Sequence, residues 1–123
     1  MKAINYDRVS TDEQAKEGHS LGAQQDRNIS FIHSQGWDYI DSYIDDGYSA
    51  KDLNRPAIQR LLKDAEQKKF DVVVVYRLDR LVRSVVDLHY VLKHFDKHGI
   101  MYKSVTEIYD TTMVMGVKKR KQG

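Results

Sequence analysis

The sequence predicts an α/β fold, with a mainly parallel sheet of about four strands flanked by helices. Segments that favour strands alternate with amphipathic segments along the chain, which is the order of βαβ units. The run FDVVVVY at 70–76 is apolar and β-branched, as in a strand buried on both faces of a parallel sheet. Gly36 and Gly99 each follow a helical pattern, at positions where a left-handed cap residue ends a helix.

The first half of the chain is predicted to contain two strands and one long helix. Residues 2–9 alternate like a strand, and Ser10 and Glu13 then have the spacing of a capping box, which predicts a helix start. A helix is expected over 21–35 and a second strand over 37–44, where Trp and Tyr favour β structure. The polar segment 45–55 is predicted to be a loop.

The second half repeats this alternation. Pro56 stands where a helix favours its first residue, and the apolar spacing that follows predicts a helix to about residue 69. The buried strand over 70–76 comes next. Ser84 and Asp87 form another capping box, which opens a helix to about His98, and 100–106 is expected to be a fourth strand. We interpret one stripe of this last helix as core: Val85, Leu88, Val91 and Leu92.

Composition narrows the class of protein. With 123 residues and 41% apolar side chains, the chain suits one globular domain. It has no cysteine, so no disulfide or thiolate metal site can form from it. Its longest apolar run is far shorter than the roughly 20 residues of a membrane span, and no secretory signal pattern opens the chain. We therefore expect a cytoplasmic protein without a membrane partner.

Cationic side chains are clustered although the net charge is only +2. Arg77, Arg80 and Arg83 lie around one predicted turn, and residues 118–121 form a basic tail. Such clusters bind phosphate even when the total charge is near neutral, because salt limits the range of a field to about 8–10 Å.

Polar side chains follow two of the predicted strands, and ligands of parallel sheets bind beyond the carboxyl ends of the strands. These side chains are Tyr6, Arg8 and Ser10 after the first strand, and Arg77, Asp79, Arg80 and Arg83 after the third. Arg55 lies in the loop 45–55, which is expected to cover the same edge. A hydroxyl that faces several guanidinium groups suits phosphoryl transfer, because arginine supplies fixed bidentate donors to phosphate oxygens.

Local pattern alone also allows simpler interpretations. Ser10 fits a helix N-cap worth roughly 1 kcal/mol, and the arginines fit a solvated face. His94 and His98 have the i, i+4 spacing of a metal site, but without a nearby Glu signature we interpret them as surface residues. The prediction from these residues is therefore that no metal is bound.

Four ordered blocks resemble the resolvase/invertase family of serine recombinases. They are YDRVST at 6–11 with Gln14 and GHSLGAQ at 18–24, the segment 45–56 with Arg55-Pro56, YRLDRLVRS at 76–84, and Thr106-Glu107 with DTT at 110–112 and Gly116. The spacing between the first two elements is similar to that in the large serine integrases and transposases. The resemblance implies a resolvase-like catalytic domain that cuts and rejoins DNA without a cofactor.

The resemblance also implies a role for each matched residue. Ser10 is the implied nucleophile, which forms a 5′-phosphoserine link before strand exchange and religation. Arg8, Arg80 and Arg83 would surround the scissile phosphate, and Arg55 would add a contact from its loop. Asp79 would orient arginines and assist proton handling at the leaving oxygen. Supporting and substrate-binding residues would be Tyr6, Gln14, Gln24 and Arg77. Implied partners are double-stranded DNA and copies of the chain itself, as a dimer and a synaptic tetramer.

Three features depart from the family pattern. Asp7 stands where a small residue is usual, and it should point away from Tyr6 and Arg8. Val82 replaces a small residue of the second motif. We expect 1–115 to form the catalytic domain and 116–123 to be a basic tail, a truncated start of the family's oligomerisation helix. Weak DNA binding and little complete recombination are therefore expected from this chain alone.

Two other functions are consistent with the sequence. A non-catalytic DNA-binding or dimerisation module could derive from a recombinase, but it would not need an aligned serine and arginines. A flavodoxin-like or phosphate-ester enzyme would need a phosphate-binding glycine loop, and the turn at 9–12 has no glycine.

Overall fold

The computed structural model describes residues 1–14 and 20–107. The predicted tail at 116–123 and the motif residues at 110–112 lie outside the described residues. Strands β1 (Lys2–Val9), β2 (Asp38–Asp46), β3 (Val72–Val75) and β4 (Met101–Ser104) form one parallel sheet in the order β2-β1-β3-β4. The helices are α1 (Thr11–Gln14), α2 (Leu21–Ser34), α3 (Pro56–Glu66), α4 (Leu78–Leu81) and α5 (Val85–Lys97). The predicted fold class is confirmed.

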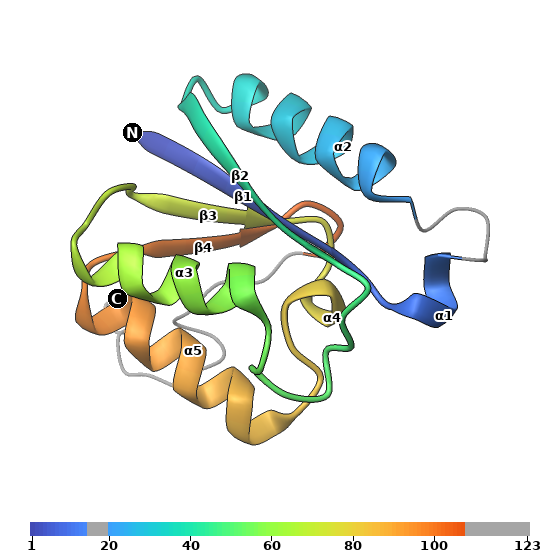
Figure 1. Cartoon of the computed structure of the whole chain (residues 1–123). Coiled ribbons are helices and arrows are strands. Elements are labelled where there is room, and N and C mark those ends of the chain that lie inside the picture. Colours follow the sequence, from blue (N-terminus) through green and yellow to red (C-terminus); the bar gives the residue numbers. More distant parts are fainter. Residues whose placement is uncertain (15–19, 108–123) are drawn as a thin grey trace.

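Helices cover both faces of this sheet, with α2 on one side and α3 and α5 on the other (Figure 1). Alternate residues of β3 accordingly belong to different apolar clusters. Val73 and Val75 pack with α3 and α5, whereas Val72 and Val74 pack with Ile32 of α2. A strand whose four residues are all buried must be apolar throughout, which is why the β-branched run predicted it.

Several boundaries and environments differ from the sequence predictions. Helix α3 ends at Glu66, and Lys68 then takes a left-handed backbone with φ 52°. Val85 is not core, because it starts α5 and is 71% exposed. His94 is not a surface residue, because its ring is half-buried and its Nε2 lies 2.8 Å from the Leu62 carbonyl oxygen. Gly36 and Gly99 end helical segments with φ of 75° and 71°, as predicted.

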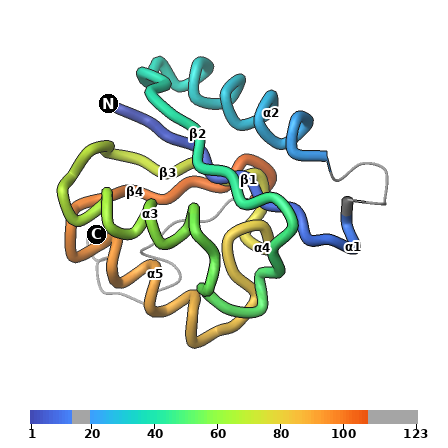
Figure 2. Tube along the Cα trace, in the orientation of Figure 1, coloured from blue at the N-terminus to red at the C-terminus, as the bar shows by residue number. Residues whose placement is uncertain are grey.

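The parallel order brings the ends of β1 and β3 to one edge of the sheet. The segment after β2 returns there, because the N–H groups of Gly47 and Tyr48 donate to the Val9 carbonyl oxygen. The chain trace shows this segment, the turn after β1 and α4 gathered at that edge (Figure 2). Among the described helices, none has the length and apolar character needed to span a bilayer.

Candidate active site

Ser10 follows β1 directly and starts helix α1 through a complete capping box. Its Oγ accepts a hydrogen bond from the Glu13 N–H at 3.1 Å, and its own N–H donates to Glu13 Oε1 at 3.0 Å. The capping interpretation of Ser10 is therefore correct for this structure. Such a cap bond is worth roughly 1 kcal/mol.

Arg8 is held at the end of β1 by contacts along both its main chain and its side chain. Gln24 of α2 pairs with the Arg8 main chain twice: its Oε1 accepts the Arg8 N–H at 3.2 Å and its Nε2 donates to the carbonyl at 2.9 Å. The Arg8 guanidinium donates to the carbonyl oxygens of Arg80, Tyr48 and Asp79. Its side chain is 1% exposed, so the surrounding main chain fixes its orientation.

Helix α4 is a single turn that carries Asp79 and Arg80 to the same place. Glu107 caps its start by accepting the Leu78 N–H at 2.9 Å. The Asp79 carboxylate pairs with Arg77 at 3.1 Å and with Arg80 at 3.3 Å. Arg80 also donates to the Arg8 carbonyl oxygen at 3.2 Å, which ties α4 to β1.

Three arginines converge on the Glu13 carboxylate. Arg80 contacts Oε2 at 2.6 Å, Arg83 contacts the same oxygen at 3.7 Å, and Arg8 contacts Oε1 at 3.5 Å. Burial alone would raise the pKa of the Glu13 carboxyl, but hydrogen bonds from Arg80 and from the Ser10 N–H, with the charges of Arg80 and Arg8, hold it well below its usual range. The three arginines therefore surround an anion that the protein itself supplies.

Arg55 lies beneath this cluster and has other partners. Its guanidinium donates to the Tyr6 hydroxyl at 2.7 Å, to the Leu81 carbonyl oxygen at 2.6 Å and to the Asp52 carbonyl oxygen at 3.0 Å. The Tyr6 hydroxyl in turn donates to Asp45 at 2.7 Å. Asp45 also accepts two N–H groups from the first turn of α3. Burial raises the pKa of the Tyr6 hydroxyl, which stays protonated and joins the arginine to the carboxylate.

Asp7 points to the opposite face of the sheet, under α2, as predicted from strand alternation. Its carboxylate accepts Asn28 Nδ2 at 2.7 Å and Asn5 Nδ2 at 2.9 Å, and the residue has no exposed surface. Burial raises the pKa of the Asp7 carboxyl from 3.8 to about 6, against the lowering effect of these two hydrogen bonds.

The structure brings most of the predicted site residues together. Those linked directly in the cluster are Arg8, Ser10, Gln24, Arg77, Asp79, Arg80 and Arg83. Arg55 and Tyr6 form a buried pair below it, and none of their recorded contacts reaches Ser10. Gln14 is the last residue of α1, and its side chain lies outside the described part of the chain.

Sequence reasoning missed the roles of Glu13 and Asp45. The capping box located Glu13 next to Ser10, but nothing in the sequence shows that its carboxylate meets arginines from 80 and 83. Asp45 falls in the range predicted to be a loop, but it lies in β2, which continues to Asp46. The first N–H groups of the helix at Pro56 need acceptors, but nothing in the sequence shows that Asp45 supplies them.

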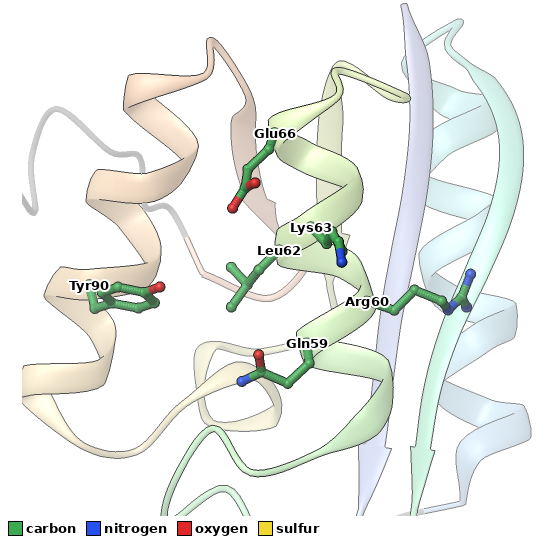
Figure 3. A pocket seen from close by; sticks show the side chains of 6 residues that line it. All are labelled: Gln59, Arg60, Leu62, Lys63, Glu66 and Tyr90. Atoms are coloured by element: carbon green, nitrogen blue, oxygen red, sulfur yellow. The ribbon is translucent and has the colours of Figure 1, made fainter.

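Outside the cluster, a shallow groove runs between α3 and α5 (Figure 3). Gln59 and Leu62 of α3 face Tyr90 of α5 across it, while Arg60 turns away toward β2. There Arg60 lies 4.1 Å from the centroid of the Tyr43 ring. No predicted site residue lines this groove. Within the described ranges, no group of three or more His, Cys, Asp or Glu residues is arranged to hold a metal ion.

Comparison with known proteins finds similarity to one protein family over almost the whole chain. The profile of the resolvase N-terminal domain family matches residues 3–118. The chain is 34% identical to the DNA invertase Hin of Salmonella typhimurium over 116 residues, which are 94% of this chain and 54% of the invertase. It is 52% identical over 62 residues to uncharacterized immunity region protein 3 of Bacillus phage phi105, covering 50% of this chain and 76% of that protein. The crystal structure of the N-terminal catalytic domain of TP901-1 integrase superposes with a TM-score of 0.85 at 46% identity, covering 94% of this chain and 86% of that one.

Proposed function

Because the chain belongs to the resolvase N-terminal domain family of serine recombinases, we propose that it is the catalytic domain of a DNA recombinase and that Ser10 is its nucleophile. The observation that carries the proposal is the anion site beside Ser10, where Arg8, Arg80 and Arg83 converge on one carboxylate. A phosphodiester has the charge and the oxygen spacing that such a cluster binds.

The proposed reaction is a transesterification. Ser10 Oγ loses its proton and bonds to phosphorus, the bond from phosphorus to the 3′ oxygen breaks, and that oxygen takes up a proton. The product is a 5′-phosphoserine link and a free 3′ hydroxyl. The 3′ hydroxyl of an exchanged strand then attacks the phosphoserine and releases Ser10. Because the covalent link conserves the energy of the phosphodiester, no nucleotide cofactor is required.

The surrounding residues have distinct proposed roles. Arg80 and Arg83 bind the phosphate oxygens directly, since their terminal nitrogens already contact carboxylate oxygens. Arg8, which is buried next to them, adds positive charge. Asp79 orients Arg77 and Arg80, and it is proposed to assist proton handling at the leaving 3′ oxygen. Arg55 and Tyr6 support α4 through the Leu81 carbonyl oxygen.

We also propose the partners of the protein that carries this domain. Its substrate is double-stranded DNA in the bacterial cytoplasm or nucleoid. Two copies bind each DNA site and two such dimers form the synaptic tetramer in which strands are exchanged. The chain spans about half the length of the DNA invertase that it matches. We therefore propose that selection of the DNA site is a property of the whole protein that carries this domain.

A covalent-trapping assay tests the nucleophile. The longest form of the protein would be incubated with a nicked suicide DNA duplex, and adducts would be resolved on a denaturing gel. Ser20→Ala is a matched control, because Ser20 Oγ also caps a helix, by accepting the Ala23 N–H at 3.1 Å. We expect an adduct from the wild type and from Ser20→Ala, and none from Ser10→Ala. A protein that binds DNA but forms no adduct would instead be a non-catalytic binding module.

A further inference from the structure

The cations assigned above to the DNA phosphate are already engaged by the protein. Glu13 offers two oxygens to Arg8, Arg80 and Arg83, and it also accepts the N–H of Ser10. Its side chain is only 13% exposed. Two oxygens that accept from several guanidinium groups next to the Ser10 main chain are what the proposed reaction requires of a bound phosphate.

The charges explain why an anion is needed here before DNA arrives. Arg8 and Arg80 are 1% and 2% exposed, and the Arg8 guanidinium donates to the Arg80 carbonyl oxygen. Two buried cations so close repel each other and are costly without a partner anion. Asp79 pairs with Arg80, but its other oxygen is committed to Arg77. Glu13 is the carboxylate that contacts Arg8, Arg80 and Arg83 together.

Competition follows from the same contacts. A terminal N–H group of Arg80 donates a hydrogen bond to Glu13 Oε2 at 2.6 Å. A phosphate oxygen cannot accept that same hydrogen bond while the carboxylate oxygen occupies the position. We propose that Glu13 is a positioning residue that occupies the anion site of the DNA-free chain, keeps the three arginines converged, and yields this site to the scissile phosphate. The inference rests on the proposed function in taking that phosphate as the incoming anion.

Proton transfer is a poor alternative role for Glu13. Ser10 Oγ is directed at the Glu13 main chain, since it accepts the Glu13 N–H. The arginines also keep the carboxyl strongly acidic, and a strongly acidic carboxyl is a weak base toward a serine hydroxyl. Its effect on the reaction therefore acts through the arginines.

Glu13→Gln separates the charge from the cap. Glutamine at this position of a capping box still accepts the Ser10 N–H, so α1 keeps its start while the anion is removed. Asp12→Asn is the matched control, because it removes one negative charge from the neighbouring residue, which is exposed. The probe is inorganic phosphate added to the 123-residue chain at constant ionic strength.

Phosphate affinity is read from thermal unfolding and from the side-chain Nε–H signals of the arginines by NMR. We expect Glu13→Gln to bind phosphate at least about tenfold more tightly than the wild type or Asp12→Asn, which is about 1.4 kcal/mol. Without phosphate the variant should melt below Asp12→Asn, and phosphate should restore it. Adding Arg83→Gln to Glu13→Gln should cancel most of the gain, since Arg83 is exposed and free to meet the ion.

Equal phosphate affinity in Glu13→Gln and the wild type would overturn the inference. A loss of stability that phosphate does not restore would overturn it as well, because it would show a structural cap and nothing more. If the variant does not fold, the wild type decides. Phosphate must then shift the Ser10 and Glu13 amide signals together with the arginine signals, and arginine shifts alone would contradict displacement.

These outcomes are separable from the proposed function. An adduct that depends on Ser10, with no phosphate gain in Glu13→Gln, would refute the role of Glu13 and leave the recombinase function in place. A phosphate gain without any adduct from a DNA-binding form of the protein would refute the nucleophile and leave the competition between Glu13 and phosphate in place.

Discussion

Asp7→Asn should stabilise the chain at neutral pH and progressively less as the pH falls. The folded protein raises the pKa of Asp7 from 3.8 to about 6, so between these values the folded state holds more protons than the unfolded state. Folding stability from this group is therefore greatest below the unfolded value and is lost as the pH rises through about 6. The difference between 3.8 and about 6 corresponds to about 3 kcal/mol in full.

The asparagine fits the same hydrogen-bonding site. Asn5 can still donate to its oxygen, and Asn28 can turn its amide so that Oδ1, which has no partner now, accepts the new N–H. The burial of one negative charge is removed without a cavity. The gain at pH 8 is the cost of that charge less the difference between carboxylate and amide hydrogen bonds.

Urea unfolding of the wild type and of Asp7→Asn, at intervals from pH 4 to pH 8, measures the effect. The free energy of unfolding of the variant minus that of the wild type should increase by about 2–3 kcal/mol over this interval, with its midpoint midway between the unfolded pKa of 3.8 and the folded pKa of about 6, and it should level off above about 6. Asp26→Asn, an exposed change on the helix that covers Asp7, is the matched control. A difference that is flat with pH, or that decreases as the pH rises, would refute the reasoning.

Three further substitutions test the frame of the site. Tyr6→Phe should lower the free energy of unfolding by about 1–3 kcal/mol in urea, because the buried Arg55 loses an acceptor, and a loss below 0.5 kcal/mol would mean that Arg55 finds another. Asp45→Ala should cost about 3 kcal/mol or more by the same measurement, since three donors lose their acceptor, and a smaller cost than for Tyr6→Phe would contradict this. Gln24→Ala should speed hydrogen exchange at the Arg8 amide by about tenfold or more, and unchanged protection would show that Gln24 does not close the end of β1.

The fold was predictable because its signals are local. A buried parallel strand must be apolar on both faces, and a helix start needs acceptors three residues apart from their donors, so the β3 run and the Ser84 cap could be read from the chain. The order of the strands was not predicted. The exposure of Val85 at the start of α5 was not predicted either. The apolar stripe of α5 continues to Val85 in the sequence, but the neighbouring elements do not reach this residue.

The site was predictable only in part, for the same physical reason. The ends of parallel strands meet at one edge, so Ser10, Arg8 and Arg80 could be expected together. Which donor meets which acceptor depends on side-chain reach across elements. Gln24 of α2 contacts the Arg8 main chain, and Glu13 contacts Arg80, which lies 67 positions later in the sequence. The spacing of letters along the chain contains no information about such contacts.

The arginines of the site fall into two kinds according to the groups that they contact. Arg55 and Arg8 make most of their side-chain hydrogen bonds to carbonyl oxygens, which are fixed parts of the main chain. Arg80 and Arg83 direct terminal nitrogens at a carboxylate, which is a replaceable partner. A ligand phosphate can displace a side-chain anion far more easily than a backbone carbonyl, because the carboxylate gains water when it leaves. Under the proposed function, the first two arginines are therefore expected to act mainly as a charged frame, whereas Arg80 and Arg83 exchange the carboxylate for the phosphate when DNA binds.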